Sequence, residues 1–530
     1  MTRVSFLLFV GFLSIASSSN CRGADAIPLR LRHQVETQSD SGLYHRLEKD
    51  AAWSPSETAL IVCDMWDSHH CYRAVQRATE FAPRLESLIG KVRDAGVTVI
   101  HAPSGCMAAY EGTEARKRAI DAKPASDHPP KIADWCTEIS ASEMNVYPID
   151  QSDGGEDDTP QEHAAWAKKL EANGRNPQSP WLKQMDAITI DPSKDYISDS
   201  GTEIWNVLQQ HGIKNVILTG VHTNMCVLGR PFGLRRMAMA GKNVVLMRDL
   251  TDSMYNPAAK PYVSHFTGTD LIVDHIERHI CPTISSDQIL GGEPFRFQND
   301  HRHHLAIMIG EAEYQTSETL PRFALQTLGT DYRVSWFFPS TEDKNRFPGL
   351  DQMLAADALL ISVRRRTLPT DQLIIVQRFV RSGKPVIGIR TASHAFSLRG
   401  QLPPPGHVSW PEFDAAVFGG NYTNHYANNL KPTIELANAD AHPLIKGWKP
   451  QPFQSGGSLY VVSPIAKTAT VILSGKVDEH AAEPVAWTFQ RSDGGRSFYT
   501  SLGHRKDFEQ PEFKELLKRG IDWAVQEITP

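Results

Sequence analysis

The sequence has no excess of positive charge. Its 55 Lys and Arg residues are outnumbered by 61 Asp and Glu residues, so the formal net charge is −6. Nucleic-acid-binding proteins usually carry a basic excess, and we therefore expect no nucleic-acid partner. Beyond the N-terminus, no apolar run approaches the roughly 18 residues that a membrane-spanning helix needs. We expect the mature protein to have no membrane-embedded part.

Cysteine is absent from the second half of the chain. The seven cysteines end at Cys281, and a chain of this size builds large cores, unlike a small disulfide-stapled scaffold. A disulfide such as Cys106–Cys136 remains open, because spacing alone does not assign pairs.

The first residues have the pattern of a secretory signal. One positive charge at Arg3 precedes an apolar run from Val4 to Ala16, and small residues follow up to Ala26. That run is too short for a membrane span and has the length of a signal-peptide core. We expect residues 1–26 to be a signal peptide and the protein to be exported to the periplasm or beyond, with lipid attachment at Cys21 as the weaker alternative.

The length of 530 residues predicts two or three domains of about 100–250 residues each. We expect a polar lead-in over residues 27–55, a first domain over 56–281, a linker over 282–304, and a second domain over 305–528.

Short apolar runs alternate with amphipathic segments in the first domain. The predicted strands are 59–63, 97–100, 187–190, 216–218 and 244–246, and the predicted helices are 81–95, 202–211 and 226–240. Such alternation is typical of an α/β fold with a mainly parallel sheet covered by helices on both faces. Residues 103–180 lack periodicity and look like a long insertion beside a site. The second domain shows the same alternation, with strands at 305–309, 358–361 and 385–389, and a final helix over 511–525.

Cys226 is the most informative residue. It follows a buried strand that ends at Gly220 and opens a predicted helix. The positive field of a helix N-terminus lowers the pKa of a thiol, so we expect Cys226 to be a nucleophile. The alternative is a buried structural cysteine.

Asp64 and Lys194 strengthen the catalytic interpretation. Asp64 ends the first predicted strand, and Lys194 follows the third. The carboxyl ends of parallel strands share one edge of a sheet. We therefore expect acid, amine and thiol to meet there, although Asp64 could instead cap a helix and Lys194 could be a surface charge.

These segments resemble the isochorismatase-like cysteine hydrolases, a group that includes nicotinamidases and N-carbamoylsarcosine amidase. The resemblance is carried by the strand 60–64, by the segment from Lys194 to Ile204, and by residues 219–227. It implies a three-layer sandwich with the catalytic triad Asp64, Lys194 and Cys226. In that triad Asp64 takes the thiol proton, Lys194 supports the acid, and Cys226 attacks to form a thioester. It also implies a cis peptide at Val221–His222 that aims the N–H groups of Met225 and Cys226 at the oxyanion.

The sequence departs from this family in three ways. The spacing from Lys194 to Thr202 is one residue short, which leaves Lys183 as an alternative. Many nicotinamidases carry an Asp-x-His metal motif, and this motif is missing around His101. We therefore assign no metal or other cofactor. The alternative is a divalent ion at Asp67, His69 and His70. Arg230-Pro231-Phe232 stands where relatives usually have small residues, and a different pocket is expected. We assign the pocket wall to Asp67, His70, His101 and Asn224.

The second domain resembles the ThuA-like (trehalose-utilisation) domains, which implies a class I glutamine-amidotransferase-like, flavodoxin-like fold. The matching stretches are 310–314, 388–396, 418–425, 484–487 and 494–504. The strand-to-helix elbow reads Ile389-Arg390-Thr391 and has no cysteine, which argues against amidotransfer through a thiol. We expect a polar pocket at Arg390, His394, His425 and His504.

The first domain predicts a hydrolase. A cysteine nucleophile favours cleavage of a C–N bond in a small amide or ureido compound through a thioester. The alternative is a carbohydrate-processing or sugar-binding protein that acts through the second domain, with a vestigial first domain. The expected partner is a small-molecule substrate, and self-association to a homo-oligomer is possible by resemblance.

Overall fold

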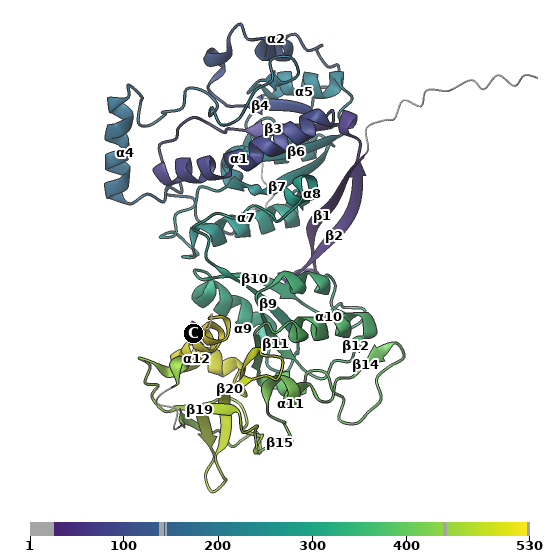
Figure 1. Cartoon of the computed structure of the whole chain (residues 1–530), viewed down its shortest axis with the longest axis vertical. Helices are drawn as coiled ribbons and strands as arrows, with labels where there is room; N and C mark the ends of the chain where they lie inside the picture. Colours follow the sequence, from purple (N-terminus) through teal and green to yellow (C-terminus); the bar gives the residue numbers. More distant parts are fainter. Residues whose placement is uncertain (1–25, 137–142, 144–145, 438–441, 527–530) are drawn as a thin grey trace, which may run out of the picture.

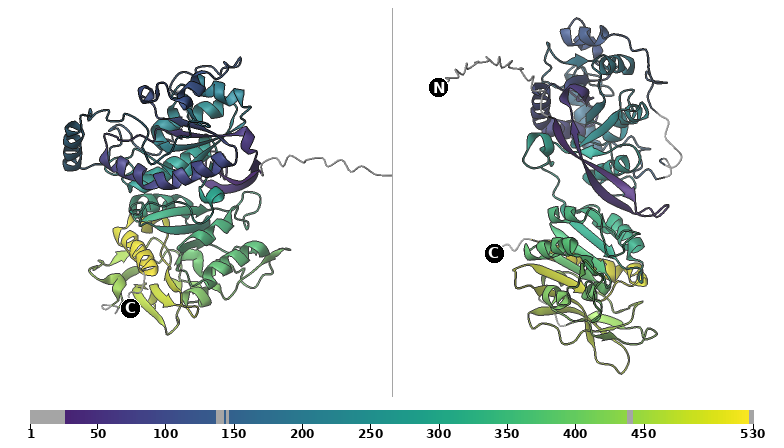
Figure 2. Two further views of the ribbon diagram at one scale, coloured as in Figure 1. Left: turned by 45° about the horizontal axis from the view of Figure 1, so that its top comes forward. Right: turned by 90° about the vertical axis from the view of Figure 1, so that its right-hand side faces the viewer.

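The computed structural model describes residues 26–136, 143, 146–437 and 442–526. It contains two large sheets that lie one above the other along the long axis of the molecule (Figures 1 and 2). The expected signal peptide lies outside the described residues, except for Ala26. No helix of the described part is both long and apolar enough to cross a bilayer.

The first sheet has eight strands in the order β2-β1-β8-β7-β6-β3-β4-β5. Strands β3 to β8 are parallel to their neighbours, whereas β1 is antiparallel to both β2 and β8. The strands are β1 (Ile27–Glu36), β2 (Tyr44–Trp53), β3 (Thr58–Cys63), β4 (Thr98–Ala102), β5 (Tyr196–Ile197), β6 (Asn215–Val221), β7 (Asn243–Asp252) and β8 (Thr283–Ile284).

Helices cover both faces of this sheet because side chains of buried parallel strands alternate between two apolar cores. Leu60 and Val62 of β3 pack with Leu85 of α1 on one face. Ala59 and Ile61 pack on the other face, with the helices α5, α6 and α7. The helices are α1 (Tyr72–Asp94), α2 (Glu114–Ile120), α4 (Pro160–Ala172), α5 (Gly201–Gln210), α6 (Leu234–Met239), α7 (His265–His279) and α8 (Asp287–Leu290), with short turns η1 (Pro55–Glu57), η2 (Met107–Tyr110) and η3 (Thr223–Val227).

Three expectations for the first half need correction. Residues 27–53 form the hairpin β1–β2, so the lead-in is part of the sheet. Residues 187–190 are not a strand, and the edge strand is β5 (Tyr196–Ile197). The helix expected over 226–240 is a turn, η3, then a break around Pro231, then α6, because proline removes a backbone donor.

The second sheet has nine strands in the order β10-β9-β11-β13-β21-β20-β19-β16-β17. The first five are parallel and the rest antiparallel. The strands are β9 (His303–Gly310), β10 (Tyr332–Phe337), β11 (Ala358–Val363), β13 (Val386–Ile389), β16 (Thr433–Leu436), β17 (Phe453–Gln454), β19 (Ala469–Lys476), β20 (Glu483–Gln490) and β21 (Arg496–Thr500), with the small pairs β12 (Leu368–Pro369)–β14 (His407–Val408) and β15 (Asn424–His425)–β18 (Tyr460–Val461).

Two helical layers enclose the parallel part of this sheet. Helices α9 and α12 pack on one face, and α10 and α11 on the other. The helical segments are α9 (Thr316–Phe323), η4 (Ala324–Leu328), η5 (Leu350–Ala355), α10 (Thr370–Arg381), η6 (Arg390–His394), α11 (Phe413–Phe418), η7 (Pro443–Ile445), η8 (Arg505–Glu509) and α12 (Pro511–Val525). Both halves are therefore α/β folds with mainly parallel sheets, as expected.

The junction between the two halves is polar. Arg46 of β2 donates to Asp274 of α7 (2.7 Å) and to Ser335 of β10 (3.0 Å), and Gln352 of η5 donates to its carbonyl. The segment 282–304, expected as a linker, contains β8 and α8 and so continues the first sheet. The hairpin thus ties both domains together.

The cysteines of the described residues are free thiols. Cys106 and Cys136 are both buried and unbonded, so the pairing considered for them is not formed.

Candidate active site

The turn after β6 holds the expected nucleophile. The peptide bond Val221–His222 is cis, at the position the resemblance implies. Residues Thr223–Val227 then form one π-helical turn, which buries Cys226. The carbonyl of His222 accepts from the N–H groups of Met225 (3.0 Å) and Val227 (3.1 Å). The N–H of Met225 is therefore engaged within the turn, contrary to the expected oxyanion role.

Asp64 lies directly beside this thiol. It follows β3, is fully buried, and has a left-handed backbone (φ 48°). Its Oδ1 accepts from the N–H of Ser104 at 2.7 Å, and its Oδ2 accepts from Nε of Arg230 at 3.0 Å. The Cys226 thiol lies close enough to this carboxyl group for each to shift the pKa of the other. Acid and thiol thus meet at the carboxyl ends of adjacent strands, as predicted.

Burial sets the protonation of both groups. It raises the pKa of Asp64 above its usual value, and the Arg230 guanidinium opposes that rise. Burial, and then the negative charge of Asp64, raise the pKa of the Cys226 thiol far above its usual range. The expected lowering by a helix N-terminus is therefore outweighed. At neutral pH the site therefore holds Cys226 as a thiol beside the Asp64 carboxyl group.

Lys194 does not lie at the edge of the sheet where Asp64 and Cys226 meet. Its side chain is exposed, and it precedes β5, whose first residue Tyr196 pairs with Ile100 in the middle of β4. A residue before a parallel strand lies at the opposite end of the sheet from Asp64, which follows β3. The mistaken strand at 187–190 is what placed Lys194 after a strand. The alternative, Lys183, pairs with Asp186 instead (2.5 Å).

Arg230 occupies the cationic position next to Asp64. It comes from the segment between η3 and α6, four residues after Cys226, and its guanidinium also lies over the Trp135 ring at 5.0 Å. We noted this residue only as a departure from small residues in relatives. The signal that could have identified it was an arginine one helical turn beyond the nucleophile.

A cluster of aromatic and imidazole rings lies on the segment that follows Asp64. Trp66, two residues after Asp64, stacks on Trp181 at 4.8 Å between ring centroids. His69 lies 4.7 Å from His222, and burial lowers the pKa of His222 to about 4. The imidazoles of His69 and His222 are thus neutral at pH 7, since burial lowers the pKa of both.

The four residues assigned to the pocket wall lie in different environments. Asp67 accepts from Arg175 and from the amides of Leu182 and Lys183, so it anchors the insertion. His101 is fully buried between Gln184 and Asp195. Asn224 clamps both backbone groups of Met254. Only His70, half-buried against His69, remains near the rim.

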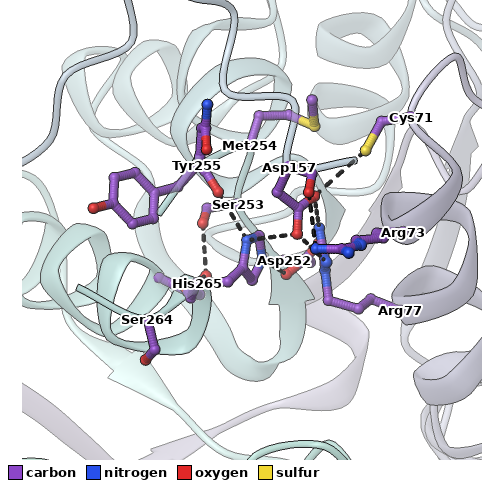
Figure 3. A network of polar contacts seen from close by, with 12 residues as sticks. Cys71, Arg73, Arg77, Asp157, Asp252, Ser253, Met254, Tyr255, Ser264 and His265 are labelled. Carbon is purple, nitrogen blue, oxygen red and sulfur yellow. Dashed lines mark hydrogen bonds and ion pairs between the residues drawn. The ribbon is translucent and has the colours of Figure 1, made fainter. Parts of the chain in front are cut away.

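A buried ionic network joins α1, the acidic turn at 153–158, the end of β7 and the start of α7 (Figure 3). Arg77 of α1 forms two hydrogen bonds to Asp157 and one to Asp252, which also accepts from His265. Burial alone would raise the pKa of Asp252, but Arg77 and His265 hold it well below its usual value. Asp252 pairs with Val221 in the sheet register. The acidic turn at 153–158 therefore contributes a buried carboxylate, that of Asp157.

The described residues do not gather Asp67, His69 and His70 into a metal site, because Asp67 is engaged by the insertion and Nδ1 of His69 accepts from the N–H of Cys71. Cys71, Glu156 and Asp158 place ligand atoms within 4.8 Å of one another. However, the Asp158 oxygens accept from the amides of Tyr72 and Arg73, which is the role of a helix cap.

In the second domain the four predicted pocket residues converge on two tyrosines. The Arg390 guanidinium lies over the rings of Tyr314 and Tyr460. His394 and His425 face Tyr460, and His504 faces Tyr314. The Nη1 group of Arg390 also donates to the carbonyls of Ser458 and Ser501, whereas its Nε is buried without a hydrogen-bond partner.

Known families match both halves. The isochorismatase domain matches residues 121–261, and the trehalose-utilisation (ThuA) family matches residues 304–524. A comparison with curated proteins finds no match.

Among solved structures, a ThuA-like protein from Bacteroides uniformis shares 18% identity, with a TM-score of 0.32, over 44% of this chain and 96% of its own. A cysteine hydrolase from Pseudomonas syringae shares 17%, with a TM-score of 0.27, over 44% and 92%. N-carbamoylsarcosine amidase from Thermoplasma acidophilum shares 15%, with a TM-score of 0.24, over 44% and 97%. The family matches, and not these distant structures, identify the halves: the chain carries an isochorismatase domain followed by a ThuA domain.

Proposed function

We propose that the isochorismatase domain hydrolyses a C–N bond of a small amide or ureido compound, with Cys226 as nucleophile and Asp64 as general base. The observation that carries this proposal is the contact between the Cys226 thiol and a buried carboxyl group that Ser104 and Arg230 hold in place. A thiol with a raised pKa needs an adjacent base to become nucleophilic.

The reaction has two stages. In the first, Cys226 Sγ attacks the substrate carbonyl carbon while its proton passes to Asp64, and Asp64 then protonates the leaving nitrogen, so that ammonia or an amine departs and a thioester remains. In the second, Asp64 takes a proton from water, the hydroxyl oxygen attacks the thioester, and the released thiolate recovers the proton. Each turnover consumes one water molecule.

We assign to Arg230 the role that was expected of Lys194, which is to support Asp64. Its positive charge favours the ionised form of Asp64, which is the form that accepts the thiol proton. The stacked rings of Trp66 and Trp181 support a flat, uncharged acyl group as the substrate. We further propose that the protein is exported through residues 1–26 before it acts.

The test is a screen of small primary amides and ureido acids for ammonia release by the wild-type chain and by Cys226→Ala and Asp64→Asn. Both variants should lose at least about 10³-fold in kcat/KM, since the nucleophile and its base act as a unit.

Cys281→Ala is the matched control, because Cys281 is also a buried free thiol but lies at the end of α7, before β8. It should retain activity. Ammonia release that persists in Cys226→Ala would overturn the proposal.

A further inference from the structure

A cavity of about 430 Å³ lies in the ThuA domain, beside η6 and α11. Its walls come from three separate stretches around residues 393–399, 410–414 and 421–423, with Arg365 at the edge. This volume falls within the range of about 300–1,000 Å³ that is usual for small-molecule sites. It does not share residues with the Asp64–Cys226 site.

Two arginines of this cavity have unused guanidinium groups. In the part of the chain that the structure describes, the side chains of Arg365 and Arg399 form no ion pair or hydrogen bond. The adjacent Arg364 is different, because it pairs with Glu313 at 2.8 Å. Arg365 is half-buried and Arg399 is exposed. Burial, and then the positive charge of Arg399, lower the pKa of Arg365. The two like charges repel each other, so an anion that lies between them is favoured.

Acidic groups cancel only part of this charge. Asp414 is the one carboxylic acid among the lining residues, and its Oδ1 accepts from the N–H of Ala415. Burial raises the pKa of Asp414 to about 6. Burial and the surrounding arginines, Arg365 first, lower the pKa of His394 to about 3, so its ring is neutral. The cavity is therefore positive at neutral pH.

Ring faces line the same cavity. Tyr422 lies 4.6 Å from His394, and Trp410 packs against Phe413 below it. Aromatic faces beside hydrogen-bonding groups suit a ring that has one apolar face and several hydroxyls.

The backbone at the two arginines is also unusual. Arg365 and Arg399 have φ values of 49° and 53°, in the left-handed region that favours glycine. The Arg365 N–H donates to the carbonyl of His394 at 3.1 Å, which fixes the arginine against the cavity wall. Left-handed non-glycine residues cluster at ligand sites more often than elsewhere.

We propose that this cavity binds a sugar-sized ligand bearing a carboxylate or phosphate group, which Arg365 and Arg399 grip while its ring stacks on Tyr422. Guanidinium groups recognise both anions through paired N–H donors. The site is independent of Cys226, and the ligand class differs from a neutral sugar in its charge.

The experiment is titration calorimetry on the full chain with glucuronate, glucose 6-phosphate, glucose, trehalose and inorganic phosphate. Glucuronate or glucose 6-phosphate should bind at least about tenfold more tightly than glucose or trehalose, and more tightly than phosphate alone. Binding should weaken as the NaCl concentration rises from about 0.05 to about 0.5 M, because salt at these concentrations screens ion pairs.

Arg365→Gln and Arg399→Gln should each weaken binding of the anionic sugar at least about tenfold. Arg364→Gln is the matched control and should bind as the wild type does, as should Cys226→Ala. If Arg365→Gln does not fold, Arg365→Lys takes its place, because lysine keeps the positive charge. Thermal melting shows whether each variant is folded. Equal affinity for glucose, equal affinity for phosphate alone, or binding that survives the double glutamine variant would overturn the proposal.

Discussion

At the scale of single residues, the arrangement around Asp64 determines what the site can do. The carboxyl group faces a thiol, a backbone N–H and a guanidinium. Burial favours its protonated form and Arg230 favours its ionised form, so the two effects act on the pKa of Asp64 in opposite directions.

The first prediction concerns this balance. Only ionised Asp64 accepts a proton, so activity should fall as the pH drops through its raised pKa. Arg230→Gln removes the opposing cation, which should move the acidic limb of the kcat/KM profile to higher pH, whereas Arg230→Lys should restore it in part. An acidic limb that stays in place in Arg230→Gln would contradict the role of Arg230.

The second prediction concerns Lys194. Its exposed side chain lies before β5, so Lys194→Ala should change kcat/KM by less than about twofold, as is usual for surface substitutions. A loss comparable to that of Asp64→Asn, measured in the same amide assay, would restore Lys194 to the triad.

Sequence reasoning identified Asp64 and Cys226 because each follows a strongly apolar strand, and buried strands are easy to recognise. It misplaced Lys194 because β5 has only two residues, Tyr196 and Ile197, too few for a periodic signal. It missed the contact of Arg230 with Asp64 because that contact joins residues 166 positions apart. Local patterns do not carry such long-range information.

At the scale of elements, the close approach of β3 and β6 brings Asp64 and Cys226 together. Gly220 has φ 104°, and a Cβ there would lie 2.0 Å from the carbonyl oxygen of Cys63. Only glycine lets the two strand ends meet at this distance.

The third prediction follows from that contact. Gly220→Ala should force the strands apart, lower the free energy of unfolding by at least about 1–3 kcal/mol, the usual cost of overpacking, and abolish activity. Chemical denaturation measures the first effect.

Gly96→Ala is the control that distinguishes the steric clash of a new Cβ from the strain of a left-handed backbone. Gly96 has a similar φ of 95°, but a Cβ there meets nothing within 4 Å. It should cost about 1 kcal/mol, the strain of a left-handed non-glycine residue, and should retain activity. Equal losses in the two variants would show that the contact with Cys63 is unimportant.

The regular elements of both domains could be predicted where periodicity was strong. The helix over 511–525 coincides with α12, and the α/β class follows from the alternation. The hairpin β1–β2 was missed although Ile27, Leu29 and Leu31 alternate with polar residues in β1, because β2 carries mostly polar residues such as Lys49 and Asp50. Its stability comes from tertiary contacts with α7 and β10.

At the scale of the whole molecule, that hairpin couples the domains. Arg46 joins Asp274 of the first domain to Ser335 of the second. Burial alone would raise the pKa of Asp274, but Arg46 holds it below its usual value, which marks the pair as ionised.

The fourth prediction is that the two domains of the Arg46→Ala variant unfold at different temperatures. Breaking a buried pair costs about 3–5 kcal/mol, so thermal unfolding should resolve into two transitions. Arg30→Ala, on the adjoining strand with a side chain 62% exposed, should leave the transition within the small range of about 0.5 kcal/mol that is typical of surface changes. A single unchanged transition in Arg46→Ala would contradict the coupling.

The central claim is that Cys226 carries the acyl group of the substrate. The most direct measurement is peptide mass spectrometry of the full chain, acid-quenched during turnover of an amide that the screen identifies. The account predicts an acyl adduct on the Cys226 peptide that disappears when the substrate is exhausted and does not form in Asp64→Asn. Turnover without an adduct on Cys226, or an adduct on another residue, would contradict it.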